Sequence, residues 1–161
     1  MDARLETLSR QVGSLLRQRS LTLATAESCT GGWAAQVVTH TAGSSAWFER
    51  GFVTYANEAK IEMLGVSPET LADHGAVSRR TAEEMALGAL NNSNALISLS
   101  ITGIAGPTGG SPGKPVGTVC FGWCLRGRMP DSERCQFTGN REEIRLQAVV
   151  HALEGLLARA K

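Results

Sequence analysis

The apolar positions near the start of the chain recur at the spacing of an amphipathic helix. The apolar residues are Leu5, Leu8, Val12, Leu15 and Leu16. Charged and polar residues stand between them, so the pattern predicts a helix over residues 3–18 with one buried face. It also differs from a signal peptide, in which a basic stretch precedes a continuous apolar run.

Farther along, short apolar runs alternate with helical patterns. The runs predict strands at 21–25, 50–56, 95–102, 117–125 and 132–139, the last two forming a hairpin around "RGRMPD". Helices are expected over about 30–40, 57–65, 78–92 and 141–159. The expected N-caps are Asn57, Ser78 and Asn140, and Glu143 gives Asn140 the spacing of a capping box.

This alternation predicts the fold class. Helices between strands, followed by a hairpin, indicate a three-layer α/β/α sandwich with a mixed, mostly parallel central sheet. Neither an internal repeat nor a linker divides the sequence, and 161 residues suffice for one well-packed core. We therefore expect a single α/β domain over residues 1–161.

Composition excludes several classes of protein. No apolar run approaches the roughly 20 residues that cross a bilayer. The 16 basic and 15 acidic residues are spread along the chain, and no basic patch indicates a nucleic-acid partner. The four cysteines are too scattered for a disulfide framework, and none has the spacing of a zinc motif. We expect a cytoplasmic protein without a metal, a cofactor, or a membrane or nucleic-acid partner.

Two loops follow predicted strands and carry the candidate chemistry. "TAESCTGG" spans 25–32, and a Gly/Pro-rich loop spans 103–115. Ligands of open α/β sheets collect beyond the carboxyl ends of strands. Small residues let the backbone approach such a ligand closely. The two loops therefore predict one pocket.

Ser28 is one candidate nucleophile in the first loop. It, or Thr30, could equally serve as a helix cap. The neighbouring Cys29 is a rival, because a helix N-terminus acidifies a thiol, although a small buried residue would also suit that position. Unpaired N–H groups at Gly31 and Gly32 would favour an oxyanion. The segment is not a G-x-S-x-G elbow.

The base is also ambiguous from the residues alone. His40 and His151 fall within predicted helices, whereas His74 is expected in a loop. Lys60 follows Tyr55 by five residues at a strand-to-helix junction. A lysine base needs its pKa lowered from about 10.4 to roughly 7–8, whereas a helix-borne lysine is usually solvated.

The second loop is not a phosphate-binding loop of the Walker type, because Thr108 and Pro115 occupy positions that require glycine and Ser or Thr. It could still wrap a ligand with its N–H groups and the hydroxyls of Thr102 and Thr108. Arg141 and Arg145 begin the last predicted helix. They could form surface ion pairs, or Arg141 could bind a phosphate at that helix N-terminus.

Six segments together resemble a known family. They are "TAESCTGG", "GFVTYANEAK", "HGAVS", "TGIAGPTGG", "KPVGTV" and "GNREEIR". In order and spacing they are similar to the CinA C-terminal domain family, whose stand-alone members are nicotinamide-nucleotide amidohydrolases of the PncC type. The resemblance implies metal-independent deamidation of nicotinamide mononucleotide to nicotinate mononucleotide and ammonia, in pyridine-nucleotide recycling. It further implies that Ser28 is the nucleophile, assisted by Lys60 and Tyr55.

From this resemblance we expect neutral Lys60, hydrogen-bonded towards Tyr55, to take the Ser28 proton. The other expected site residues bind the oxyanion or the substrate: Thr30, Gly31, Gly32, Thr102, Gly103, Ala105, Gly106 and Arg141. The alternatives are hydrolysis of another small amide and a catalytically silent nucleotide-binding domain. The amphipathic first helix, with Trp47 and Phe48 as exposed aromatics, also predicts a homo-oligomer.

Overall fold

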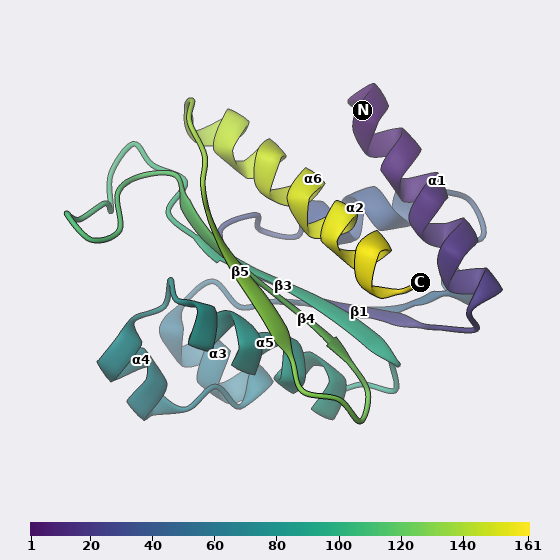
Figure 1. Ribbon diagram of the computed structural model, residues 1–161, viewed down its shortest axis with the longest axis horizontal. Coiled ribbons are helices and arrows are strands. Elements are labelled where there is room, and N and C mark those ends of the chain that lie inside the picture. The colour runs from purple at the N-terminus through teal and green to yellow at the C-terminus, as the bar shows by residue number, and fades with distance from the viewer.

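The computed structural model describes residues 1–161 as three layers, with helices on both faces of one sheet (Figure 1). The helices are α1 (Ala3–Gln18), α2 (Trp33–His40), α3 (Asn57–Leu64), α4 (Pro68–His74), α5 (Arg79–Asn91) and α6 (Arg141–Arg159). The strands are β1 (Leu23–Glu27), β2 (Phe48–Val53), β3 (Ile97–Gly103), β4 (Thr118–Leu125) and β5 (Asp131–Gln136). The predicted α/β/α class is confirmed.

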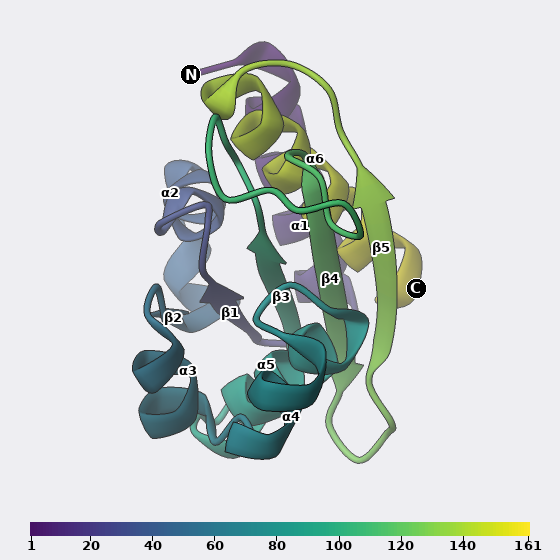
Figure 2. The same ribbon diagram turned by 90° about the vertical axis from the view of Figure 1, so that its left-hand side faces the viewer.

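The sheet has the order β2-β1-β3-β4-β5. β1 pairs in parallel with both β2 and β3, whereas β4 is antiparallel to β3 and to β5. Four strands therefore run in one direction and only β4 is reversed, as predicted for a mixed, mostly parallel sheet. Figure 2 shows the carboxyl ends of β1 and β3 at the same edge, where both candidate loops emerge.

Some predicted helix starts and caps differ from those in the structure, for local reasons. α2 begins at Trp33 rather than near residue 30, because Gly31 and Gly32 have φ values of 60° and 103° that no helix continues. Asn57 is the first residue of α3 and Ala56 is its N-cap, so the predicted Asn57 cap is wrong. Ser78 and Asn140 do cap α5 and α6, and Glu143 completes the predicted capping box.

The sequence pattern did not predict helix α4. α4 is seven residues long, with Ser67 as its cap and Pro68 in its first turn. Its last residue is His74, which was expected in a loop. Seven residues give too little periodicity for a helical pattern to emerge, so only the Ser-Pro signal could have revealed it.

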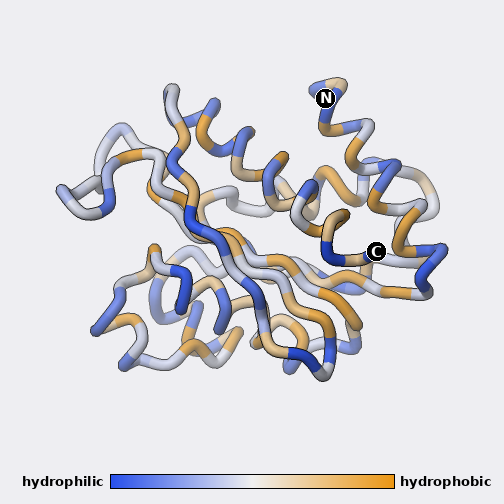
Figure 3. Tube along the Cα trace, viewed as in Figure 1, coloured by the Kyte–Doolittle hydropathy of each residue, from blue (hydrophilic) through white to orange (hydrophobic).

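The sheet separates two apolar clusters of unequal size. The larger has 25 buried residues and lies between the sheet and α1, α2 and α6, whereas the smaller has 10 residues and lies under α5. Figure 3 shows apolar and polar residues alternating along α1 and α6, and apolar residues of both helices are buried in the larger cluster. No helix is both long and apolar enough to cross a bilayer.

Trp47 belongs to the larger cluster and is only 1% exposed. Its ring lies so close to Gly13 of α1 that a Cβ there would approach it to 2.8 Å. The prediction that Trp47 is exposed for self-association is therefore wrong, and Phe48 is half-buried. The expected homo-oligomer stays a prediction.

Candidate active site

The end of β1 sends two consecutive side chains to opposite faces of the sheet. Glu27 points towards α2, where its carboxylate accepts hydrogen bonds from the N–H groups of Ala34 (2.8 Å) and Ala35 (3.0 Å) and from the Thr30 hydroxyl (2.6 Å). This buried carboxylate satisfies N–H groups at the helix start that Gly32, which has no side chain, leaves unpaired. The sequence analysis did not assign Glu27 this role.

Ser28 follows on the other side of the sheet, as the two-residue period of a strand requires. Its N–H donates to the Ile101 carbonyl at 2.9 Å, which extends the β1–β3 pairing one residue beyond the strand. On the other edge of β1, the Thr54 N–H donates to the Glu27 carbonyl at 2.8 Å. Ser28 is therefore held by rigid backbone on both sides and is only 8% exposed.

Lys60 reaches Ser28 from the first turn of α3. Its side chain is 1% exposed, and Nζ lies 3.1 Å from Ser28 Oγ. Nζ also donates to the Thr54 carbonyl (3.0 Å) and to the Tyr55 carbonyl (3.1 Å). No carboxylate forms an ion pair with this amine, so Glu58 and Glu62 do not offset its burial.

Burial lowers the pKa of Lys60 from its ordinary value, and the neighbouring Cys29 opposes that shift. The hydrogen bonds suit a neutral amine. When it is neutral, the amine has two N–H donors for the two carbonyls and one lone pair for the Ser28 hydroxyl; when it is charged, it donates to Ser28 Oγ instead. The geometry therefore allows Lys60 to accept the Ser28 proton.

Cys29 does not have the properties of the rival nucleophile. Burial raises the pKa of Cys29 to about 11, with Glu27 adding to the shift and Arg145 opposing it. A thiol with that pKa is protonated near neutral pH and is a weak nucleophile. The prediction that the helix N-terminus lowers the pKa of this thiol is thus wrong, because desolvation raises the pKa by more than the nearby N–H groups lower it.

Tyr55 lies in the cleft, but its phenol does not contact Lys60. The lysine bonds the Tyr55 backbone carbonyl, whereas the phenol oxygen accepts a hydrogen bond from Arg141 at 3.0 Å and the side chain is 59% exposed. Arg141 also donates to the Gly106 carbonyl at 2.8 Å. Arg141 and Tyr55 thus join α6, the start of α3 and the long loop at the mouth of the cleft.

The cleft itself has a volume of about 250 Å³. Its lining includes eight expected site residues: Ser28, Tyr55, Lys60, Thr102, Gly103, Ala105, Gly106 and Arg141. Asn57 and Thr108 add an amide and a hydroxyl. None of the three histidines lines it.

Thr30, Gly31 and Gly32 are not among the lining residues. The Thr30 hydroxyl donates to Glu27, and the Gly31 N–H donates to the Ser28 carbonyl at 3.0 Å. The expectation that the Gly31 N–H is unpaired is therefore wrong. The N–H groups of Cys29 and Thr30 donate to no backbone carbonyl.

Arg145 is a further residue of this site, and its function was left open by the sequence. Its guanidinium donates to the carbonyls of Cys29 (3.0 Å) and Thr30 (3.3 Å) and lies 5.5 Å from the centroid of the Trp33 ring. Arg145 therefore holds the carbonyl side of the Ser28 loop, which turns the N–H groups of that loop the other way. The i+4 spacing from Arg141 was the only signal in the sequence.

Comparisons with known proteins identify relatives of this chain. The model of the CinA C-terminal domain matches residues 5–160. The chain is 56% identical over 156 residues to the nicotinamide-nucleotide amidohydrolase PncC of Escherichia coli K12, covering 96% of this chain and 94% of that protein. It is 48% identical over 151 residues to PncC of Pseudomonas putida, covering 94% of each.

Solved structures give the same result. The crystal structure of the competence/damage inducible protein CihA from Agrobacterium tumefaciens superposes with a TM-score of 0.95 at 47% identity, covering 98% of this chain and 96% of that chain. A CinA superfamily protein from Klebsiella pneumoniae gives a TM-score of 0.93 at 41% identity, with 97% of each chain covered.

Proposed function

The chain belongs to the CinA C-terminal domain family, and on that premise we propose that it is a nicotinamide-nucleotide amidohydrolase. The reaction would convert nicotinamide mononucleotide and water into nicotinate mononucleotide and ammonia, a step of pyridine-nucleotide recycling. PncC relatives at 50–56% identity over nearly the whole chain support the substrate class. The cleft supports the chemistry.

A single observation carries the proposal: a buried amine without a carboxylate partner lies 3.1 Å from a serine hydroxyl at the end of a strand. A serine hydroxyl is a weak nucleophile until a base removes its proton. Burial favours the neutral form of Lys60, and two carbonyls direct its free lone pair at Oγ. This is the arrangement that a serine–lysine amidase needs.

In the first half-reaction, Ser28 Oγ attacks the carboxamide carbon while Lys60 Nζ takes the hydroxyl proton. The N–H group of Cys29, a residue that lines the cleft and whose N–H donates to no backbone carbonyl, stabilises the oxyanion. Lys60 then gives its proton to the departing nitrogen, so that ammonia leaves and an ester to Ser28 remains. In the second half, water attacks this ester and loses a proton to Lys60, and Lys60 gives that proton to Ser28 Oγ as the acid is released.

Residues at the mouth of the cleft orient the substrate. Arg141 has N–H donors beyond the two that bind Tyr55 and Gly106, and it stands at the N-terminus of α6, where an anion is favoured. We therefore propose that Arg141 binds the phosphate of the nucleotide. The backbone of Thr102, Gly103, Ala105 and Gly106 forms the wall beside the ribose, and Tyr55 positions Arg141.

Ammonia release from nicotinamide mononucleotide tests the function. The wild-type protein should release one equivalent per substrate, and Ser28→Ala should lose about 10³-fold or more in kcat. Free nicotinamide, which lacks the ribose phosphate, should be hydrolysed far more slowly. Ligand-induced thermal stabilisation without ammonia release would instead identify a nucleotide-binding domain. If the protein hydrolysed other small amides but not the nucleotide, the proposed mechanism would stand and the proposed substrate would be wrong.

A further inference from the structure

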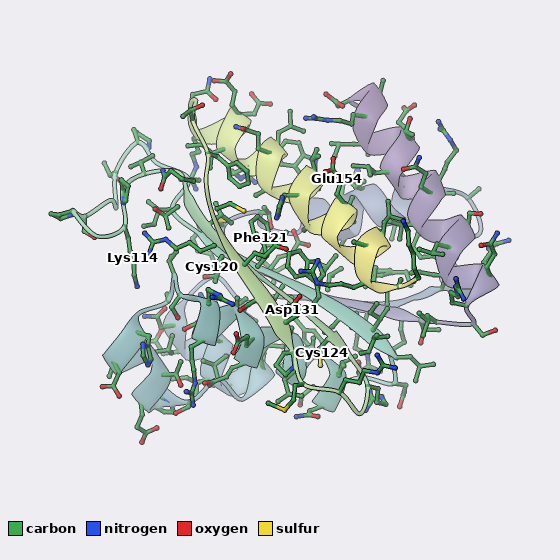
Figure 4. The ribbon with its side chains drawn as sticks, in the orientation of Figure 1. Lys114, Cys120, Phe121, Cys124, Asp131 and Glu154 are labelled. Carbon is green, nitrogen blue, oxygen red and sulfur yellow. The ribbon has the colours of Figure 1, made fainter.

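A second cluster of reactive side chains lies at the far edge of the sheet from the cleft, between β5 and α6. Glu133 and Cys135 are two residues apart on β5, so both face α6, whereas Ser132 faces α5 and accepts a hydrogen bond from Arg79. His151 meets them from the middle of α6. Figure 4 labels Phe121 and Asp131, which mark this face of the sheet.

The three side chains converge on one point. His151 Nε2 lies 2.9 Å from Glu133 Oε1 and 3.4 Å from Cys135 Sγ, and the three ligand atoms all lie within 4.8 Å of one another. In a tetrahedral zinc site, bond lengths of 2.0–2.3 Å place neighbouring ligand atoms about 3.3–3.6 Å apart. The two distances from His151 Nε2 are within about half an ångström of that range, whereas Cys135 Sγ and Glu133 Oε1, which lie within 4.8 Å of each other, need side-chain adjustments of up to about 1.5 Å to reach it.

The same distances do not suit a nucleophilic triad. In a Cys–His–Glu relay, one ring nitrogen accepts the thiol proton while the other donates to the carboxylate. Here both the thiol and the carboxylate contact Nε2. A cation bound by all three side chains explains these distances better than a nucleophilic triad does.

Surrounding groups hold these donors in place. The His151 ring centroid lies 4.6 Å from that of Phe121, and Trp123 and Phe137 each lie 6.1 Å away. The second oxygen of Glu133 accepts a hydrogen bond from Arg159 at 2.8 Å. Such outer contacts orient ligands and tune metal affinity in known sites. All three donor residues are half-buried.

We propose that Glu133, Cys135 and His151 bind Zn²⁺ or a similar divalent cation, which ties the edge strand β5 to α6. Binding would replace the thiol proton, which is released to solvent, and the thiolate, the imidazole and the carboxylate would be the three protein ligands. Cys135 and His151 lie 16 residues apart, on a strand and a helix, so spacing rules for zinc motifs did not reveal them.

Titration of the chelator-treated, reduced full-length protein with Co²⁺, followed by absorbance, tests the proposal. One equivalent should produce a thiolate-to-cobalt charge-transfer band and the strong visible bands of a four-coordinate site. Zn²⁺ should displace the Co²⁺ and raise Tm. The band should disappear in Cys135→Ser, and Zn²⁺ affinity should fall at least tenfold in Cys135→Ser and in His151→Asn.

Two matched variants control this experiment. Cys124→Ser removes a different cysteine of the hairpin, and His40→Gln removes a histidine that pairs with Glu6 but has no thiol beside it. Both should keep the cobalt band. Circular dichroism verifies that each variant is folded. Absence of a thiolate band in the wild-type protein, or an unchanged band in Cys135→Ser, would overturn the site. Ammonia release from nicotinamide mononucleotide should not depend on the cation, because the cluster shares no residue with the cleft.

Discussion

The two faces of the sheet are built from the same strands but have opposite character. Along β3, Ile97, Leu99 and Ile101 enter the large apolar cluster under α1, α2 and α6. The alternating residues on the other face are hydroxyls, and each donates to a backbone carbonyl. Ser98 bonds the carbonyl of Ala86 at 2.7 Å and Ser100 that of Ala82 at 2.6 Å. Thr102 bonds the carbonyl of Ala76 at 2.8 Å.

Small residues bring the helices of this second face unusually close. A Cβ on Gly122 would lie 2.3 Å from the Ala82 carbonyl oxygen, and one on Gly88 would lie 1.9 Å from that of Leu64. α5 is thus pressed against the sheet, and α3 against α5. The face under α1, α2 and α6 therefore supplies most of the apolar burial. The face under α5 holds polar groups at fixed positions and ends at the cleft with Thr102 and Lys60.

The largest effect should come from removing the polar group that the second face buries. Lys60→Met keeps the length of the side chain but has no base, so kcat for nicotinamide mononucleotide should fall by about 10²–10⁴-fold. Steady-state ammonia release measures this loss. Lys114→Met, a change of a lysine that lies outside the cleft, should stay within about twofold of wild type.

The same variant has a predicted pH signature. Because the pKa of folded Lys60 lies below the ordinary 10.5, the unfolded chain holds a proton that the folded protein lacks between those two values. Stability of the wild-type protein should therefore rise with pH across that window relative to Lys60→Met. Urea unfolding of both proteins at several alkaline pH values measures it. Parallel curves would show that Lys60 titrates normally.

The opposite result is expected from the apolar face. Leu99→Ala leaves a cavity in the large cluster and should cost about 2–5 kcal/mol in the free energy of unfolding. Activity per folded molecule should remain near that of wild type. Denaturant unfolding and active-site counting at low temperature separate the two quantities. A loss of kcat in fully folded Leu99→Ala would mean that the faces are not independent.

Arg145 connects the faces, since it extends from α6 to the carbonyls of the Ser28 loop. Arg145→Lys loses the planar contact with two carbonyls and with Trp33. We expect kcat to fall about tenfold, equivalent to 1.4 kcal/mol, with little change in KM. Arg141→Lys should instead raise KM, because Arg141 is assigned to the phosphate. Steady-state kinetics of both variants distinguish positioning from binding.

The smallest effect should come from one hydroxyl of the second face. Ser100→Ala removes a buried hydrogen bond to the Ala82 carbonyl, which should cost about 1 kcal/mol of stability. Ser100→Val should be much worse, because a larger side chain would push α5 away from the sheet. Comparing the midpoints of urea unfolding tests whether these hydroxyls serve mainly to allow close packing.

Much of this fold follows from local pattern. The long helices α1, α5 and α6 have strong periodicity and clear caps, and the sequence predicts their ends to within about one residue. The nature of the two sheet faces was not predicted. In "ALISLSIT", serines alternate with apolar residues, but only the position of α5 gives their hydroxyls carbonyl partners.

Within the site, sequence reasoning alone could not choose between Ser28 and Cys29 or between Lys60 and His74. Those choices depend on burial, which tertiary contacts determine. The alternation at the end of β1 explains why Ser28 faces Lys60, but only once the strand is known to end at Glu27. The Tyr55 phenol and the Gly31 N–H were expected to contact reacting groups and have other partners, Arg141 and the Ser28 carbonyl.

The proposed mechanism requires Lys60 to be uncharged when Ser28 reacts. Its direct test is the titration of the Lys60 side-chain nitrogen by NMR in protein carrying ¹⁵N-lysine, assigned with Lys60→Met and compared with the pH dependence of kcat/KM. We expect a pKa for Lys60 clearly below the ordinary 10.5, with kcat/KM lost as pH falls through that same value. A Lys60 resonance that titrates at the ordinary lysine pKa of 10.5, while the enzyme remains active at neutral pH, would contradict the mechanism.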